Sequence, residues 1–337
     1  MKKKLQTRLG EITVPQKHIL HKSRTGFSTS PCLTELLCYM GQELVFETAS
    51  EAIEKLTFVA IQSKQIERVC HHYGEKIEEY IAKAEVVGIT QEQTKSKEST
   101  THYVMVDGGM VLTREEKWKE MKLCRIFQAS DNVTISKERN YITRSQYIAH
   151  LGDYRAFFEK VEKTTDYLPE KIVIADGAKW IWKWTEETYP EATQILDFYH
   201  AKEHLCCFAN NYFKDEEQRR KWIDAQCLWL FNDGVKKVID ILNQLQIANG
   251  NNAKCRDDLV RYYQANQGRM QYKTYRENGW LIGSGAMEAA HRHVIQERMK
   301  LSGQRWTIKG AQQIANLRVM RKSNQWNLVC DLINNAA

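Results

Sequence analysis

The sequence lacks a long apolar run and a signal peptide. No segment of the 337 residues reaches the roughly 18 consecutive apolar residues of a membrane span. The basic start, MKKKLQTRLGE, is not followed by the apolar stretch of a secretory signal. We therefore expect a cytoplasmic protein without a membrane partner, and the missing signal favours a bacterial source. A hydrophobic content of 42% and a charged content of 27% are ordinary for a soluble globular chain with room for two domains.

The nine cysteines never form a C-x-x-C pair, although this spacing is typical of zinc sites. Cys206 and Cys207 are adjacent and cannot bind one zinc ion with the usual finger spacing. We therefore expect reduced, mostly buried thiols and no structural zinc. The sequence also contains no internal repeat and no low-complexity tract.

The net charge of +7 is unevenly distributed. Residues 1–24 and residues 283–322 each carry a net charge of +6, whereas residues 25–282 carry about −4. Two basic stretches around a mildly acidic middle suggest a polyanionic partner such as DNA. The alternative is a solvated basic surface without a nucleic-acid partner, and charge alone does not separate the two.

The amino-terminal third reads as a basic arm followed by helices. Residues 1–31 show little periodicity, and we expect an arm that is partly ordered at best. Residues 32–85 have apolar side chains at helical spacing, including a helix–turn–helix pattern whose second helix begins near Ser63. This pattern predicts a DNA-binding domain with Lys64 and Arg68 toward phosphates, or otherwise a plain helical bundle.

A polar linker is expected at residues 86–100, and strand signals follow it. Residues 103–106, 110–112 and 122–127 predict an antiparallel meander. A helix over 144–164, a strand over 171–175, a helix over 178–188 and a strand over 192–196 are expected next. The resulting β-β-β-α-β-α-β order is that of an α/β layered domain.

The remaining segments are predicted to be helical. Residues 201–279 carry no strand signal and predict an α-helical insertion, broken near 248–252. Residues 101–200 and 280–322 would together form one α/β domain around that insertion. Residues 323–337 form a C-terminal tail.

Two aspartates stand where a predicted strand ends. Asp107 and Asp176 each follow an apolar run and each precede glycine. If their strands are neighbours, the two carboxylates meet, and they repel unless a cation lies between them. Mg²⁺ prefers such oxygen ligands. Asp-Gly after a strand is also a common turn signal, so each aspartate taken alone has a structural explanation.

A third carboxylate, Glu288, lies in the first turn of a basic helix that follows Gly283-Ser284-Gly285. An acid at this place is favoured by the helix dipole, which is its simpler explanation. Together with the two aspartates it would complete a two-metal site for phosphoryl transfer, in which no side-chain nucleophile is required.

The sequence resembles the DDE transposases of bacterial insertion sequences. The resemblance is carried by Asp-Gly at 107–108, Asp-Gly at 176–177, DFYH at 197–200, and above all GSGAMEAAHRHVIQERMKLSGQRW at 283–306. TASEAIEKL and SKQIERV in the helical head extend it to nearly the whole chain. It is closest to the Kra-type group, relatives of the Mutator-like transposases.

This resemblance implies a ribonuclease-H-like catalytic domain with a large α-helical insertion, preceded by the helix-turn-helix-like domain. It implies that Asp107, Asp176 and Glu288 bind Mg²⁺ or Mn²⁺ and that the enzyme cleaves and joins double-stranded DNA at the terminal repeats and target. A homo-oligomer is expected because two ends must be paired. The family also has longer amino-terminal regions, so this chain resembles a short form.

The same resemblance gives roles to Asp197 and His200, which would support the active site or contact the DNA end, or they form a structural Asp–His hydrogen bond. Trp180, Trp182 and Trp184 alternate on a predicted helix and cannot all face one side, so Trp182 is a candidate to stack on an unpaired base, with core packing as its alternative. The basic helix and the segment after it would contact DNA through His291, Arg292, Arg298, Lys300 and Arg305, or these cations are ordinary surface charges.

Two other functions are compatible with the sequence. A truncated or domesticated copy would bind DNA without transposing it. A ribonuclease-H-like nuclease would cleave branched nucleic acid without joining strands.

Overall fold

The computed structural model describes residues 2–7, 10–15, 27–87, 100–136, 139–247 and 250–335. The chain divides into two compact units. The first unit comprises Met1–Glu98, Gly108–Leu168 and Ala289–Ala337. The second unit comprises Ser99–Asp107 and Pro169–Glu288. None of the described helices is both long enough and apolar enough to cross a membrane.

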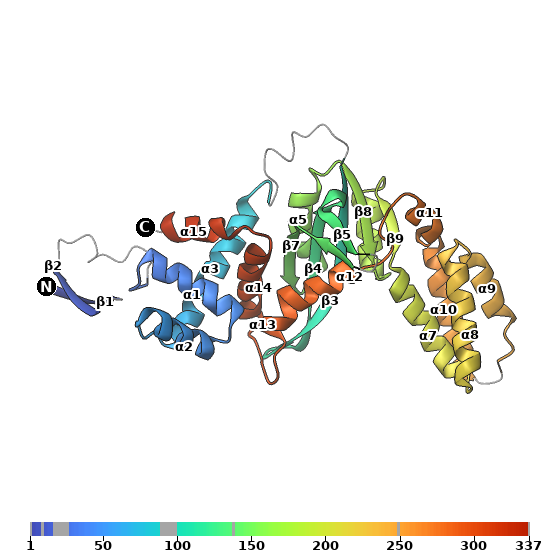
Figure 1. The fold of residues 1–337 in the computed structure, drawn as a ribbon, viewed down its shortest axis with the longest axis horizontal. Helices are drawn as coiled ribbons and strands as arrows, with labels where there is room; N and C mark the ends of the chain where they lie inside the picture. The colour runs from blue at the N-terminus through green and yellow to red at the C-terminus, as the bar shows by residue number, and fades with distance from the viewer. Residues whose placement is uncertain are drawn as a thin grey trace. The chain divides into compact units, whose positions relative to one another are not determined.

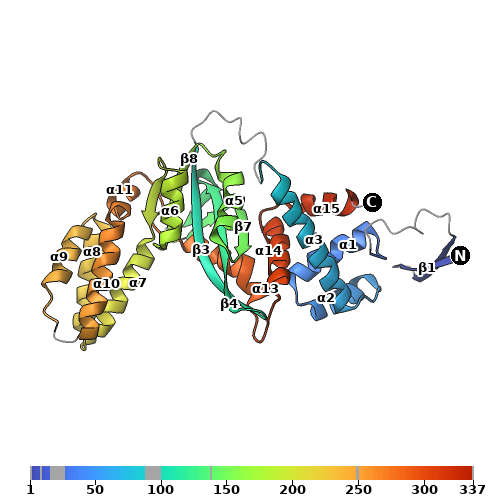
Figure 2. The ribbon, with the colours of Figure 1, turned by 180° about the vertical axis from the view of Figure 1, so that it is seen from behind.

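A five-stranded mixed sheet lies among the helices, which confirms the predicted α/β class (Figures 1 and 2). Its strand order is β7-β4-β3-β8-β9. β3 pairs with β8 in parallel, β8 pairs with β9 in parallel, and β4 pairs with β7 antiparallel. These strands are β3 Thr101–Thr113, β4 Lys117–Gln128, β7 Gln146–Leu151, β8 Glu170–Ala175 and β9 Thr193–Leu196.

The first predicted turn is absent, because residues 101–113 form one long strand. Asp107-Gly108-Gly109 stays extended inside β3 instead of separating two strands. A Cβ atom at Gly108 would collide with the side chain of Glu120 on β4. The Glu120 side chain thus occupies the space beside Gly108, and it would have to move if a larger residue replaced the glycine.

The predicted helix over 144–164 is wrong in its first half. Residues Gln146–Leu151 form β7, and the helix α5 begins only at Tyr154 and ends at Thr165. Gly152, with φ of +110°, and the capping residue Asp153 separate the two elements. Pairing with β4 outweighs the helical spacing of the apolar side chains here, and β7 supplies the third strand of the β-β-β-α-β-α-β order.

The second unit follows the sequence prediction closely. β8 and β9 contain Ile172, Val173, Ile174, Ile195 and Leu196, all fully buried, as is usual for parallel strands covered on both faces. Helix α6, Lys179–Thr188, connects them. The described residues of the segment 201–279 contain no strand. Five helices occur there: α7 Phe198–Tyr212, α8 Glu216–Phe231, α9 Val235–Gln244, α10 Gly250–Asn266 and α11 Tyr272–Glu277.

The first unit contains the predicted amino-terminal helices, and the linker predicted at 86–100 falls mostly outside the described residues. Part of the expected arm is an antiparallel hairpin, since Lys2 pairs with Pro15 and Thr7 with Gly10. The other elements of this unit include β1 Lys2–Thr7, β2 Gly10–Pro15, α1 Pro31–Glu43, α2 Phe46–Thr57, α3 Ser63–Lys83, β5 Asn132–Ser136, β6 Arg139–Ile142, α14 Ile308–Lys322 and α15 Trp326–Asn335.

Helix α14 packs against α3 through polar and backbone contacts. The Asn316 side-chain amide donates to the carbonyl oxygen of Gly74 at 2.9 Å. A Cβ atom at Gly74 would collide with the backbone of Gln313. The expected C-terminal tail contains α15, whose Trp326 indole N–H donates to Glu35 on α1 at 2.6 Å. The tail is thus part of the first unit's helical core.

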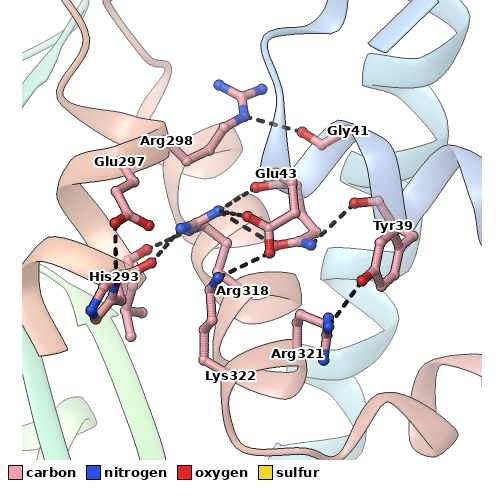
Figure 3. Close-up of polar contacts among 11 residues, drawn as sticks. Tyr39, Gly41, Glu43, His293, Glu297, Arg298, Arg318, Arg321 and Lys322 are labelled. Carbon is pink, nitrogen blue, oxygen red and sulfur yellow. Dashed lines mark hydrogen bonds and ion pairs between the residues drawn. The ribbon is translucent and has the colours of Figure 1, made fainter. Parts of the chain in front are cut away.

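Two buried arginines bind the helices of the first unit together (Figure 3). Arg318 of α14 is fully buried and donates to the carbonyl oxygens of Gln42, His293 and Val294. Arg298, only 1% exposed, donates from Nε to the carbonyl oxygen of Gly41 at 3.1 Å. These bonds join α14 and α1 to the π-helical turn at His291–Gln296 and to α13, Glu297–Met299.

Candidate functional site

Asp107 and Asp176 lie at the same level of two neighbouring parallel strands. The register pairs Met105 of β3 with Ile174 of β8, and each aspartate is two residues further on. Asp107 is still within β3, whereas Asp176 is the first residue after β8, and the Asp107 carboxylate is near enough to influence Asp176. The sequence predicted Asp107 at the end of a strand, but it lies within β3. The pairing of β3 with β8 ends at Met105, two residues before Asp107.

The pKa of Asp176 is raised above its ordinary value. Burial is the main cause, and the nearby Asp107 carboxylate adds to it, whereas the backbone N–H of Ala178 and His200 act in the opposite direction. The Ala178 N–H donates to the Asp176 carboxylate at 3.0 Å. Two carboxylates that influence each other in a partly buried place form a site with unbalanced negative charge.

Tyr262 of α10 fixes the backbone at Asp176. Its hydroxyl donates to the Asp176 carbonyl oxygen at 2.8 Å. The next residue, Gly177, has φ of +98°, and a Cβ atom there would lie 2.8 Å from the Tyr262 ring. Glycine is therefore required both for the backbone conformation and for the tyrosine to approach. Burial, with the negative charges of Asp176 and Asp197, raises the pKa of the Tyr262 hydroxyl, so it remains a donor.

Asp197, only 4% exposed, connects two loops of the second unit. One carboxylate oxygen caps α7 by accepting from the backbone N–H groups of Tyr199, at 2.6 Å, and His200, at 3.2 Å. The other oxygen accepts from the backbone N–H of Ser284 at 2.9 Å and from its hydroxyl. Asp197 is thus saturated with hydrogen bonds and has a supporting role. Its bond to His200 goes to the backbone, not to the imidazole.

The loop before Glu288 is held at further points. The Tyr103 hydroxyl of β3 accepts from the Leu281 N–H at 3.1 Å, and the Ile282 carbonyl oxygen accepts from the Phe198 N–H at 2.9 Å. Gly283 is needed because a Cβ atom there would lie 2.6 Å from the Tyr199 ring. This loop therefore fixes where α12, Gly285–Ala290, begins, and Glu288 lies exposed in its first turn.

Two histidines of α7 extend from Asp176 toward Tyr262. The rings of His200 and His204 are 4.9 Å apart, and the rings of His204 and Tyr262 are 4.3 Å apart. Burial and the neighbouring His200 lower the pKa of His204. Of these three rings, Tyr262 contacts the Asp176 backbone through its hydroxyl, and the charge of His200 acts on Asp176 in the direction that lowers its pKa.

The donor set suits a hard divalent cation. Asp107 and Asp176 offer carboxylate oxygens, and the smaller, Coulombic part of the raised pKa of Asp176 comes from Asp107, a repulsion that a cation would relieve. Across the ranges that the structure describes, no three His, Cys, Asp or Glu side chains are grouped closely enough to hold a metal ion. The two aspartates thus fit a cation, and the exposed side chain of Glu288 would have to turn toward them to complete a three-carboxylate site.

Five of the predicted DNA-contacting side chains are exposed in the first unit: Lys64 and Arg68 on α3, Arg292 in the π-helical turn, and Lys300 and Arg305 in the segment that follows it. These five side chains are accessible at the surface, and their contact with DNA stays a prediction.

The other three predicted DNA contacts are buried, which agrees with the core-packing alternative for Trp182 and differs from the surface positions expected for His291 and Arg298. Trp182 is 5% exposed, with the Arg269 guanidinium 4.6 Å above its ring. Arg298 is enclosed by the rings of Phe46 and Trp306. His291, 6% exposed, lies against Gly109 of β3.

Two of these residues lie on the buried face of their helical segment. His291 and Arg298 share that face with Met287, Val294 and Ile295, at ordinary helical spacing. A cation on the apolar face of a helix is a signal of burial that the sequence interpretation did not use. Trp182 is covered by Arg269, which lies 87 positions further along the chain. No local sequence pattern indicates this contact.

Sequence reasoning missed Tyr262, Ser284 and Tyr103 as supports of the site. Ser284 stood out only as part of Gly283-Ser284-Gly285 before the basic helix, and its hydroxyl donates to Asp197. Tyr262 lies 86 residues from Asp176. The glycine after Asp176 was the one local signal that something approaches the backbone there.

Comparisons with known proteins add no further identification. No model of a known protein family matches the chain. No curated protein matches it either.

Proposed function

We propose that the protein is a DDE transposase that cleaves and joins DNA strands with Mg²⁺ or Mn²⁺. The observation that carries this proposal is the juxtaposition of Asp107 and Asp176 on neighbouring parallel strands, with the pKa of Asp176 raised by burial and by Asp107. Such a pair needs a cation to be stable in its ionised form. Bacterial insertion-sequence ends are the proposed substrate, and a homo-oligomer would hold two ends together.

The proposed role of Glu288 depends on how its loop is held. Tyr103, Asp197 and Phe198 bind the loop at 281–284, and Glu288 follows one turn later. The base of α12 is thus fixed while the carboxylate of Glu288 is exposed. In the proposed active state Glu288 turns toward Asp107 and Asp176, where its charge becomes favourable once cations have been bound.

In this proposal Asp107, Asp176 and Glu288 hold the metal ions, which when bound would activate the attacking oxygen and stabilise the leaving oxygen. Asp176 must lose its proton before it can bind a cation, and His200 favours that loss when protonated. Tyr262 and Asp197 keep the two carboxylate-bearing loops in place. Lys64, Arg68, Arg292, Lys300 and Arg305 would hold the DNA backbone.

The architecture supports the same reading. The sheet has the β-β-β-α-β-α-β order, and a helical segment separates β9 from the helix of Glu288. We propose that this is a ribonuclease-H-like domain with an α-helical insertion, and that α1–α3 form the helix-turn-helix-like DNA-binding part.

The test is metal-dependent nicking of a duplex that carries the inverted repeats flanking the gene. The wild-type protein should nick it with Mg²⁺ or Mn²⁺ and not in excess chelator. Asp107→Ala, Asp176→Ala and Glu288→Gln should each bind the duplex and reduce nicking by a factor of roughly 100 or more. Asp240→Asn, which alters an exposed carboxylate on α9, is the matched control and should nick normally.

Three other outcomes would each contradict a different part of this proposal. Nicking by Asp107→Ala at the wild-type rate would show that the carboxylate assignment is wrong. Binding without nicking by the wild-type protein would indicate a DNA-binding protein only. Cleavage without joined strands among the products would indicate a nuclease.

A further inference from the structure

Trp118 is an unusually exposed aromatic side chain at the start of β4. It is 59% exposed, although tryptophan is large and is mostly buried in folded proteins. It directly follows Lys117, whose backbone φ of 60° ends the tight turn between β3 and β4. The turn is rigid, because the buried hydroxyl of Thr113 accepts from the Glu116 N–H and donates to the Lys117 carbonyl oxygen.

A second loop of the first unit lies beside this turn, as both views show (Figures 1 and 2). The Arg114 N–H donates to the Trp306 carbonyl oxygen at 2.8 Å, and the Trp306 N–H donates to the Leu112 carbonyl oxygen at 3.1 Å. The loop, residues 300–305, is closed at its base by the Trp306 indole, which donates to the Met299 carbonyl oxygen at 3.1 Å. The two loops therefore form one surface.

The surface carries a net positive charge. Arg114, Lys117, Lys300 and Arg305 are exposed, and within the described part of the chain none of their side chains has an ion-pair partner. The two acids of the turn are engaged elsewhere, because Glu116 pairs with Lys119 at 2.7 Å and Glu115 accepts from the Ile308 N–H at 3.2 Å. We call Arg114, Lys117, Trp118, Lys300 and Arg305 the Trp118 surface.

We propose that the Trp118 surface binds unpaired DNA, with one nucleobase stacked on the Trp118 indole and the adjoining phosphates held by the four cations. An exposed indole offers a flat face to any base, and the cations of the same two hydrogen-bonded loops can contact the phosphates next to that base. The charge favours a nucleic acid over an apolar protein partner. The proposal rests on the proposed function only for the choice of DNA as the nucleic acid.

The experiment measures binding of the full chain to two fluorescent DNA probes. A chelator is present, so that binding is measured without metal-dependent cleavage of the probes. One probe is a blunt duplex, and the other is the same duplex with a single-stranded overhang. Trp118→Ala should weaken binding of the overhang probe by about 5- to 150-fold, the equivalent of one lost stacking contact, and leave the blunt probe nearly unchanged. Trp118→Phe should retain most of the affinity because phenylalanine can still stack.

Two further variants test the charge and the specificity of the effect. Lys300→Ala with Arg305→Ala should weaken both probes and lower the salt dependence of binding by about one unit per lost phosphate contact. Trp229→Ala on α8 removes another exposed tryptophan, 39% exposed, and should bind both probes normally.

Equal binding of the overhang probe by wild type and Trp118→Ala overturns the proposal. Tighter binding of a single-stranded RNA than of the overhang probe also overturns it, as does loss of self-association in Trp118→Ala without loss of DNA binding. These results are independent of the catalytic carboxylates, because Asp107→Ala should bind both probes like the wild-type protein. The Trp118 surface and the proposed chemistry can therefore fail separately.

Discussion

The hydroxyl of Tyr262 donates to the backbone carbonyl oxygen of Asp176 at 2.8 Å, across 86 residues of sequence. The contact joins helix α10 to the backbone of Asp176, the residue whose carboxylate the proposed reaction needs. It acts on the backbone and leaves the carboxylate of Asp176 available for a cation. Tyr262 is thus a positioning residue in the proposed site.

Replacing Tyr262 by phenylalanine should slow metal-dependent nicking without weakening DNA binding. The lost hydrogen bond contributes about 1 kcal/mol. If all of this free energy serves to position Asp176, its loss should slow nicking by roughly fivefold to tenfold. The Mn²⁺ concentration for half-maximal nicking should also rise. Tyr263→Phe is the matched control, since its hydroxyl donates to the Ala201 carbonyl oxygen at 2.9 Å. A shift of the same size in both variants would mean that Tyr262 has only a structural role.

Replacing Ser284 by alanine should loosen the loop that leads to Glu288. The hydroxyl bond to Asp197 is lost while the backbone N–H bond at 2.9 Å remains. A hydrogen bond to a carboxylate contributes about 1.5–3 kcal/mol, so urea denaturation should show a measurable loss of stability. Nicking should fall more than stability alone explains. Ser302→Ala, at an exposed position, should change neither quantity.

Replacing Arg318 by alanine should strongly destabilise the first unit. Arg318 is fully buried and donates to three backbone carbonyl oxygens, with Glu43 nearby at 3.4 Å. Its removal leaves those buried oxygens without their donor, at a cost of roughly 1–3 kcal/mol for each, whereas Glu43 keeps Lys322 at 3.0 Å. Arg321→Ala, which removes a single bond to the Tyr39 hydroxyl, should cost about 1 kcal/mol. Urea denaturation followed by circular dichroism compares the two variants, and similar losses would contradict the assignment.

His150 should make the protein less stable in mild acid. Burial, with the positive charges of Lys160 and Lys122, lowers its pKa to about 4 from the ordinary value of 6.5. Between these two values the unfolded chain holds a proton that the folded protein does not. Stability is therefore fully present above pH 6.5 and falls as the pH drops toward 4, by up to about tenfold in the unfolding equilibrium per pH unit.

The measurement for His150 is urea denaturation at several pH values between 7.5 and 4.5 (about one unit apart). His150→Gln should show a flatter pH dependence over this window, because glutamine does not titrate. His293→Gln, at an exposed position, should keep the wild-type slope. Equal slopes for wild type and His150→Gln would show that other groups cause the acid sensitivity.

The amino-acid sequence predicted most elements whose pattern is local. The amino-terminal helices, β8, α6, β9 and the all-helical character of 201–279 follow from periodicity and from short apolar runs. The error at 144–164 arose because Tyr147, Ile148 and Leu151 fit helical spacing equally well, and pairing with β4 decided for a strand. Asp107-Gly108-Gly109 read as a turn because close packing of Glu120 against glycine leaves no signal in the sequence.

The candidate site, too, has features that local sequence predicts and features that only tertiary structure sets. Asp107, Asp176 and Glu288 were chosen by residue type and by their places after strands or at a helix start, which are local properties. Tertiary structure alone decided that Asp107 and Asp176 influence each other, that Asp197 binds Ser284, and that Tyr262 supports Asp176. It also decided that Trp182, His291 and Arg298 are buried while Trp118 is exposed. Exposure and pairing depend on which distant segment covers a residue, and that is set by packing of the whole chain rather than by the neighbouring residues.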